Sequence, residues 1–184
     1  MNMIMTKKET GNPALEPLLQ QMAEGSTEAL AAFYEATRTA VYAFALSLAG
    51  EGHTAEDVMQ ETYLRAWQSA GSYLPMGKPM AWLLTITKNL VRMKYRADEG
   101  RQEPLDDTMA VPGFESASVD RLTLQAALAC LGEEERQIVT LHAIAGLRHR
   151  ETADLLGMPL STVLSKYHRA LSKLKKILKE EESR

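Results

Sequence analysis

The stretch RHRETADLLGMPLSTVLSKYHRALSKL, residues 148–174, decides the fold at the C-terminal end of this 184-residue chain. Within it, Ala153, Gly157 and Val163 stand at the spacing of a helix-turn-helix. In that motif a small residue lets two helices cross closely, a glycine forms the turn, and a branched apolar residue anchors the second helix. We therefore predict two helices on either side of Gly157, with Ser161 as the cap of the second.

The second of these helices, predicted over 161–180, has two contrasting faces. One face is apolar at 100° per residue and should be buried; it holds Val163, Tyr167, Ala170 and Leu174. The other face carries hydroxyl, guanidinium and ammonium groups, which suit base edges and phosphates. This candidate DNA-binding face consists of Thr162, Ser165, Lys166, Arg169 and Lys173. An amphipathic helix with a solvated basic face is the alternative, and the three-residue turn signature argues against it.

Charge is unevenly distributed along a chain whose net charge is only −3. Residues 148–179 contain eight lysines and arginines against two acidic residues, whereas 99–115 contain five acidic residues and a single arginine. Such segregation indicates different partners for different segments. The stretch 98–117 also holds two glycines and two prolines, so we interpret it as an interdomain linker. A single helical bundle with a long acidic loop is the alternative.

The composition favours helices throughout, because aromatic residues are only 6% of a chain that is 45% hydrophobic and 24% charged. The predicted helices are 14–22, 26–49, 54–70, 79–97, 118–130, 133–145, 148–156 and 161–180. The third begins at Thr54 with Asp57 in the capping-box position, and Pro79 fits the first turn of the fourth. The predicted fold is all-α with two helical domains. Its parts are an N-terminal extension (1–11), an N-terminal domain (12–98), a linker (99–116) and a C-terminal domain (117–184).

The third predicted helix has a polar outward stripe that includes one apolar side chain. Its inward stripe consists of Ala55, Met59, Thr62, Tyr63, Ala66 and Ala70, and its outward stripe consists of Asp57, Gln60, Glu61, Leu64 and Gln68. An apolar Leu64 among carboxylates and amides suits a protein–protein contact with a polar rim. The alternative is that Asp57 caps the helix and that its polar neighbours simply face water.

The fourth predicted helix has a basic outward face with an interleaved aromatic residue. The inward residues are Trp82, Leu83, Ile86, Leu90 and Met93, and the outward residues are Thr85, Lys88, Arg92, Tyr95 and Arg96, with Asn89 at the edge. This pattern is typical of a nucleic-acid surface, although a solvated charged face is an open alternative.

Taken together, these segments resemble the extracytoplasmic-function (ECF) group of bacterial sigma factors in the sigma-70 family. Residues 53–67, HTAEDVMQETYLRAW, resemble its polymerase-binding helix, and residues 81–90, AWLLTITKNL, resemble its promoter-melting helix. Residues 148–178 resemble its reader of the upstream promoter element. Two positions depart from the pattern, because Met93 replaces an often acidic residue and Leu164 replaces a commonly basic one.

The resemblance implies a sigma-2 domain and a sigma-4 domain that lend promoter recognition to core RNA polymerase. The residues implied to bind core polymerase are Asp57, Gln60, Glu61 and Leu64. Those implied to contact minus-10 DNA are Tyr73, Lys88, Asn89, Arg92, Tyr95 and Arg96, with the loop 71–78 capturing an unstacked base. The open alternative for Tyr73 is a core plug at the base of this loop. The helix over 161–180 would enter the major groove at the minus-35 element. An anti-sigma factor is the expected inhibitor, covering the polymerase face, the DNA face or both.

Several other classes of protein are disfavoured by what the sequence lacks. It has no glycine-rich phosphate loop, no paired cysteine ligands and no H-E-x-x-H, so we expect neither an enzyme nor a metal or other cofactor. Cys130 is the only cysteine, and no apolar run is long enough to cross a bilayer, which favours a cytoplasmic chain, monomeric when free. The alternative function is a stand-alone helix-turn-helix regulator with an N-terminal sensing or dimerisation domain. Such a regulator binds duplex operators unaided, whereas a sigma factor needs core polymerase.

Overall fold

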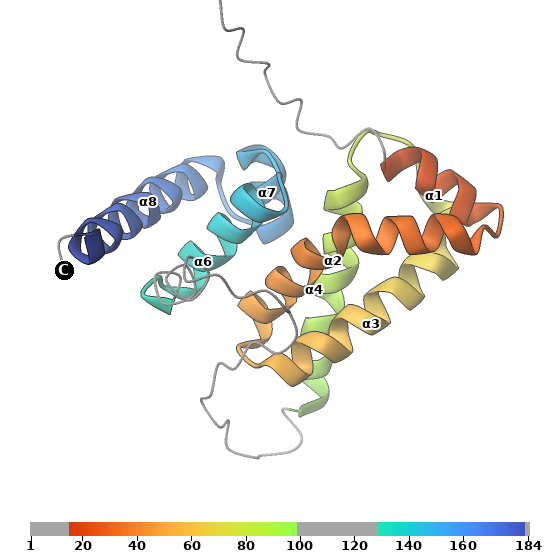
Figure 1. Ribbon diagram of the computed structural model, residues 1–184, viewed down its shortest axis with the longest axis horizontal. Helices are drawn as coiled ribbons and strands as arrows, with labels where there is room; N and C mark the ends of the chain where they lie inside the picture. The colour runs from red at the N-terminus through yellow and green to blue at the C-terminus, as the bar shows by residue number, and fades with distance from the viewer. Residues whose placement is uncertain (1–14, 99–128, 183–184) are drawn as a thin grey trace, which may run out of the picture.

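The computed structural model describes residues 15–98 and 129–182, which form helices and short connections without strands (Figure 1). The α-helices are α1 (Leu15–Ala23), α2 (Thr27–Ala49), α3 (Gly52–Ser69), α4 (Pro79–Asp98), α6 (Glu133–Val139), α7 (His149–Leu156) and α8 (Leu160–Glu182). A 3-10 turn, η1 (Ala70–Ser72), follows α3, and a π turn, η2 (Thr140–Ile144), follows α6. The predicted all-α fold is confirmed. None of the described helices is long and apolar enough to cross a membrane.

Three predicted parts lie outside the described residues: the extension 1–11, the linker 99–116, and the helix 118–130 except for its last two positions. Elsewhere several predicted helix ends are confirmed, but the predicted cap Ser161 is wrong, because α8 begins at Leu160 and Ser161 lies inside it. The Ser26 hydroxyl accepts a hydrogen bond from the Ala29 N–H at 3.1 Å, which caps α2, and α4 begins at Pro79. Gly157 closes α7 in the left-handed conformation, with φ of 70°.

The predicted start of the third helix was wrong. Helix α3 begins at Gly52, two residues before Thr54, and the Thr54 hydroxyl donates a hydrogen bond to the Glu51 side chain. Asp57 therefore lies inside the helix, where its carboxylate pairs with the Lys94 ammonium of α4 at 2.8 Å. A charged partner on a neighbouring helix thus takes the place of the predicted capping interaction.

The N-terminal region is organised around α2, which packs against α1, α3 and α4. Phe33 and Phe44 of α2 and Leu83 of α4 are fully buried in its main core. The hydroxyls of Thr37 and Tyr63 lie 2.8 Å apart in this core, and burial raises the pKa of Tyr63 far above its usual range. The inward stripe predicted for α4 is wrong at its end, because the Met93 side chain is 57% exposed.

The C-terminal region contains the predicted helix-turn-helix in α7 and α8. Ala153 and Val163 form a buried cluster with Ile138 of α6, so the signature residues hold the two helices together. A second small cluster joins Leu131, Val139 and Ala170 beneath the middle of α8. The Gly157 N–H donates to the Ala153 carbonyl, which completes the turn.

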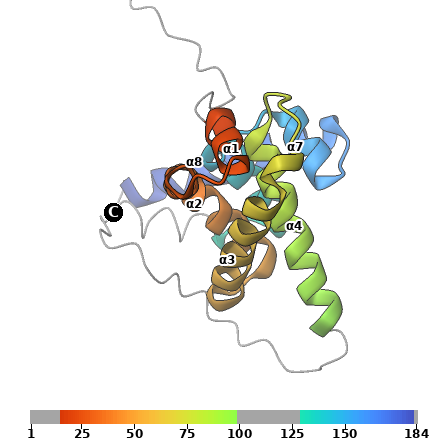
Figure 2. The same ribbon diagram turned by 90° about the vertical axis from the view of Figure 1, so that its right-hand side faces the viewer.

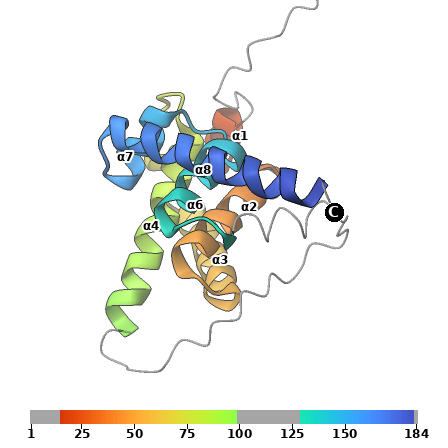
Figure 3. The same cartoon turned by 90° about the vertical axis from the view of Figure 1, so that its left-hand side faces the viewer.

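The two regions pack directly against each other. Helix α2 contacts η2 and α6, and α4 contacts α7, an arrangement visible in Figures 2 and 3. Four apolar side chains of the C-terminal region are buried in the same cluster as the N-terminal core. These are Leu141, Ala145, Leu147 and Leu155, and we call their contact with α2 and α4 the domain interface.

Candidate protein and nucleic-acid interfaces

The outward face of α3 combines one exposed apolar side chain with polar neighbours. Leu64 is 50% exposed, and Gln60 and Gln68 are exposed on the same helix. Glu61 is half-buried and accepts a hydrogen bond from Arg65 Nε at 2.8 Å. An exposed leucine with a rim of amides and carboxylates is the composition of a protein-binding patch. The structure therefore places these predicted residues on one accessible helix.

Asp57 stands apart from that patch. Its carboxylate pairs with Lys94, and the hydrogen bond from Lys94 holds the pKa of Asp57 below its usual value. His53, one helical turn earlier, lies 3.7 Å from the same carboxylate. Asp57 therefore links α3 to α4 as well as facing the solvent, a role that the predicted capping box did not include.

The basic face of α4 is only partly accessible. Asn89, Arg92 and Arg96 are exposed, as predicted. Lys88 is half-buried, and its ammonium donates a hydrogen bond to the carbonyl of Leu155 in α7. Burial lowers the pKa of Lys88, and the nearby charge of Arg92 lowers it further. The domain interface thus holds one of the predicted DNA contacts.

Tyr95 lies at the far end of the same helix. Its hydroxyl donates to the Ala49 carbonyl at 2.7 Å, which ties α4 to the C-terminal end of α2. The ring is 41% exposed, so one face stays accessible to a base although the hydroxyl is engaged.

The loop before α4 is anchored by one glutamate. Glu16 of α1 accepts a hydrogen bond from the Tyr73 hydroxyl at 2.8 Å and another from the Gly77 N–H at 2.6 Å. Burial, together with Glu16, raises the pKa of Tyr73 to about 12. The Tyr73 ring packs edge-on against Trp82 with the ring centres 5.2 Å apart. Glu16 therefore sets the position of Tyr73, and nothing in the local sequence around the loop indicated this partner.

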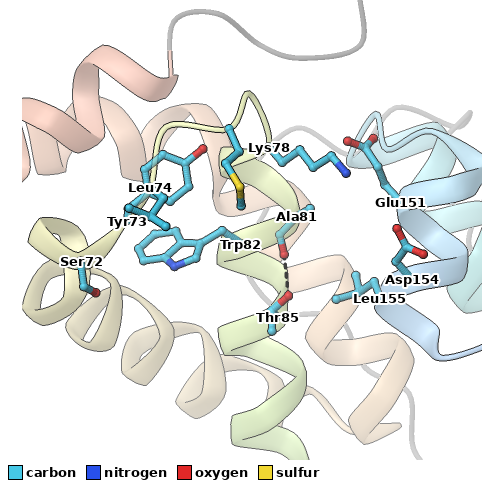
Figure 4. A pocket seen from close by; sticks show the side chains of 11 residues that line it. Ser72, Tyr73, Leu74, Lys78, Ala81, Trp82, Thr85, Glu151, Asp154 and Leu155 are labelled. Carbon is cyan, nitrogen blue, oxygen red and sulfur yellow. Dashed lines mark hydrogen bonds between the residues drawn. The ribbon is translucent and has the colours of Figure 1, made fainter.

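A cavity of about 420 Å³ opens between this loop, α4 and α7 (Figure 4). Tyr73, Trp82 and Leu155 give it apolar walls, and Leu74 and Met76 line it while remaining 68% and 70% exposed. Three charged side chains also line the cavity: Lys78 from the loop, and Glu151 and Asp154 from α7. Aromatic rings in a cavity wall are surfaces on which an unstacked base can stack.

Three of the five residues predicted for the DNA-binding face of α8 are exposed, including Lys173, whose side chain is 44% exposed. Lys166 pairs with Glu134 at 2.6 Å and Lys173 pairs with Glu135 at 2.7 Å, so both ammonium groups turn toward α6. Ser165 and Arg169 are exposed, and Thr162 is half-buried. The exposed stripe also includes Ser161, His168 and Ser172, which sequence reasoning missed.

The pairing of Lys173 with α6 has a clear physical cause. The buried side chain of Glu135 accepts from the Gly132 N–H and needs a cation, and Lys173 supplies it. The hydrogen bond from Lys173 lowers the pKa of Glu135. The acidic run 133–135 ahead of the motif was the available signal, because it predicts partners among the lysines of α8.

Aromatic rings connect the start of α7 to α8 and η2. The imidazoles of His142 and His149 stack with their centres 4.1 Å apart, and Tyr167 packs edge-on against His142. Burial lowers the pKa of His149, and the neighbouring histidines His142 and His168 add to this effect. This environment therefore favours the neutral form of the His149 imidazole.

Comparison with known proteins identifies the family of this chain. The chain matches the family descriptions Sigma-70 region 2 over residues 33–101 and Sigma-70, region 4 over residues 121–174. It is 35% identical over 141 residues to the ECF RNA polymerase sigma factor EcfG of Rhodopseudomonas palustris (strain TIE-1), covering 74% of this chain and 77% of that protein. The chain belongs to the ECF sigma factors of the sigma-70 family.

Other relatives and solved structures agree with this assignment. The sigma factor is 31% identical to the ECF RNA polymerase sigma factor SigK of Mycobacterium ulcerans (strain Agy99), covering 92% of this chain and 98% of that protein. It resembles the structure of CnrH in complex with the cytosolic domain of CnrY, with a TM-score of 0.62 and 26% identity, covering 91% of this chain and 98% of CnrH. The complex of sigma factor RpoE with the anti-sigma factor NepR from Bartonella quintana gives a TM-score of 0.64 and 27% identity, covering 79% and 94% of the two chains.

The family confirms the predicted function. This sigma factor directs RNA polymerase to promoters, and the reading as a stand-alone regulator is not favoured. The relatives are initiation factors rather than enzymes. The roles of individual residues are a separate question, for which the contacts above supply the geometry.

Proposed function

We propose that the sigma factor divides its work among three surfaces, with residues 12–98 and 117–184 as its two domains. The outward face of α3 binds core polymerase through Leu64, Gln60 and Glu61, with Asp57 at its edge. The observation that carries this assignment is the exposed leucine within a polar rim on a helix whose opposite face is buried.

The second surface holds the opened minus-10 strand. Unstacking DNA costs about 1.4 kcal/mol per base-pair step, and a protein that hydrolyses no nucleotide must offset this by binding the unstacked bases. Stacking on an aromatic side chain contributes about 1–3 kcal/mol per base. Tyr73 and Trp82 provide such rings in the cavity, and Arg92 and Arg96 provide exposed charge along α4. We assign Lys88, Asn89 and Tyr95 to the same strand.

The third surface is the exposed stripe of α8, which reads the minus-35 duplex. Arg169 is its exposed guanidinium and suits two acceptors on a guanine, and Ser165 lies beside it. The same side of the helix also exposes His168 and Ser172. Thr162 lies at its edge, and Lys166 and Lys173 reach phosphates only after leaving their glutamate partners on α6.

An anti-sigma factor is the proposed regulator, acting on a cytoplasmic sigma factor that is monomeric when free and that catalyses no reaction. The support is that one solved relative is in complex with an anti-sigma factor. The exposed apolar residues Leu64, Leu74 and Met76 offer such a protein a binding surface outside the buried cores.

The polymerase surface is tested by combining Gln60→Ala with Glu61→Ala. Because both side chains lie on the outward face, the variant should stay folded and lose at least about tenfold in affinity for core polymerase, or about 1.4 kcal/mol. Pull-down with purified core polymerase, alongside circular dichroism, measures both properties. The matched control is Gln21→Ala combined with Glu24→Ala, which removes an amide and a carboxylate from exposed positions at the end of α1. Equal recovery of polymerase by both variants would place the interface elsewhere.

A further inference from the structure

The loop that connects η1 to α4, residues 73–78, gains little stability from its own side chains. Leu74 and Met76 are largely exposed, and only the Tyr73 ring packs against the N-terminal core. Gly77 adopts the left-handed backbone conformation, with φ of 69°. Ordering a backbone segment costs conformational entropy, so a loop of this kind keeps one shape when contacts from outside hold it.

Glu16 of α1 supplies such a contact at two points. Its Oε1 atom accepts a hydrogen bond from the Tyr73 hydroxyl at 2.8 Å and another from the Gly77 N–H at 2.6 Å. The two donors lie four residues apart, so one carboxylate oxygen closes the loop at both ends. Hydrogen bonds to an ionised carboxylate are about twice as strong as those between neutral groups.

The position of Glu16 is itself fixed by the core. Leu15 and Leu19 of the same helix are buried in the N-terminal core, which holds the backbone of α1 in place. Glu16 lies in the first turn of α1, where the unpaired N–H groups of the helix favour a negative charge. The carboxylate therefore ties the loop to the same core that supports α2 and α4.

These hydrogen bonds determine which part of Tyr73 a base can use. The hydroxyl proton is engaged by Glu16, so the ring is the part that offers a stacking surface. The ring packs edge-on against Trp82, and Figure 4 shows the two rings together at one end of the cavity, with the α7 side chains at the other. Glu16 does not line the cavity, and it acts on the aromatic wall through Tyr73.

We propose that Glu16 is a positioning residue for the opened minus-10 strand: it holds the Tyr73 ring where an unstacked base can stack, and so sets how strongly that base is held. The inference rests on the proposed function of the second surface. The residues involved come from α1, the connecting loop and α4, so the arrangement needs no contact from the C-terminal region. Binding to core polymerase through α3 should be independent of Glu16.

The first measurement follows the anchor in the full-length free chain, by amide exchange at Gly77. Glu16→Ala removes the acceptor and should raise this exchange rate about tenfold, whereas Glu16→Gln keeps a neutral acceptor oxygen and should raise it about threefold. The Gly50 N–H, which donates to the Leu46 carbonyl in the cap of α2, should exchange at the same rate in all variants. Glu24→Ala is the matched control, because it removes an exposed carboxylate at the other end of α1 and should change neither amide.

The second measurement uses holoenzyme assembled with core polymerase, and single strands that carry the minus-10 element of a promoter it transcribes. An abasic site is moved through the strand, and the captured base is the position at which its removal weakens wild-type binding about tenfold. Glu16→Ala should reduce this ratio to about twofold, because it weakens binding of the intact strand and leaves the abasic strand unchanged. Glu16→Gln should restore most of the ratio. A variant that only destabilised the fold would weaken binding of both strands alike.

Tyr73→Phe tests the same contact from the other side. It keeps the ring but removes the donor to Glu16, so it should also lower the ratio of intact to abasic binding. Because the two residues act through one hydrogen bond, the double variant with Glu16→Ala should be no worse than the weaker of the two single variants.

Faster exchange at Gly77 in Glu16→Ala, together with an unchanged ratio of intact to abasic binding, would overturn the positioning role while the captured base stands. Equal exchange at Gly77 in the wild type and in Glu16→Ala would overturn the anchor itself. If the wild-type holoenzyme binds every abasic strand as tightly as the intact one, the proposed capture of a base fails, and the inference fails with it whatever the exchange at Gly77.

Discussion

The N-terminal and C-terminal regions of this sigma factor use similar helices but bury their side chains differently. In the N-terminal region, helices α1, α3 and α4 pack around α2, and Phe33, Phe44 and Leu83 are fully buried there. The described part of the C-terminal region has two small clusters of its own, and four further apolar side chains from it are buried in the core of its neighbour. The burial of these four side chains at the domain interface therefore contributes to the stability of the C-terminal region.

Charged side chains, in contrast, are arranged similarly in the two regions. On α4 a cation, Lys88, is drawn into the domain interface, and on α8 two lysines are drawn onto glutamates of α6. In both regions arginines remain exposed: Arg92 on α4 and Arg169 on α8. Lys88, Lys166 and Lys173 therefore have structural partners within the chain, whereas the Arg92 and Arg169 side chains are exposed.

The largest expected effects are on the free energy of unfolding, and they distinguish the two cores. Phe33→Ala should cost about 3–5 kcal/mol of unfolding free energy and loosen both regions, because Phe33 lies in the shared cluster. Ile138→Ala should cost about 2–5 kcal/mol and loosen only the C-terminal region, because Ile138 belongs to a cluster confined to it. Denaturant unfolding followed by residue-resolved amide exchange measures both effects. Equal loss of protection in α1 and α2 for the two variants would contradict the division of the cores.

A smaller effect distinguishes the charges of α8. Arg169→Ala should weaken promoter binding by about 1–3 kcal/mol and relax the preference at one or two upstream positions, without lowering the stability of the chain. Lys173→Ala should instead lower stability by about 1–3 kcal/mol, because it leaves the buried Glu135 without its cation. Promoter-bound holoenzyme assays and thermal unfolding separate the two outcomes. If Lys173→Ala weakens all promoters alike and leaves stability unchanged, Lys173 contacts phosphate as the sequence predicted.

Helices α4 and α8 show which features could be predicted from the sequence and which could not. Periodicity identified the helices and the buried Val163 and Ala170, because burial of apolar side chains dominates the energy of each helix. It did not identify the glutamate partners of Lys166 and Lys173, which come from another helix. Lys88 was placed on the outward face of α4 correctly, but its contact with Leu155 depends on packing between regions that no single helix encodes.

The smallest expected effect is on the pH dependence of stability. The pKa of His149 is lowered in the folded chain, chiefly by burial, so the unfolded chain binds this proton more readily. The stabilisation is therefore fully present above the ordinary histidine pKa of about 6.5 and is lost as the pH falls through the lower, folded value. Thermal unfolding of the C-terminal region should show a midpoint that falls with acidification.

Two histidine variants serve as a matched pair for this effect. The acid limb is the part of the pH profile in which the unfolding midpoint falls with acidification. His149→Gln should flatten this limb, since it removes the group that titrates beside His142 and Tyr167. His53→Gln should leave the limb unchanged, because the His53 side chain is 86% exposed. An unchanged acid limb in His149→Gln would show that another group carries the dependence.

The most direct test of the central assignment is transcription in vitro from a promoter library with purified core polymerase. The sigma factor and core polymerase together should produce transcripts that start downstream of a shared pair of minus-35 and minus-10 elements, and neither should do so alone. Arg169→Ala should change the upstream element that is selected, and the combined Gln60→Ala and Glu61→Ala variant should reduce every transcript. Specific binding of duplex operators by the chain alone, with no transcripts when core polymerase is added, would contradict its assignment as a sigma factor.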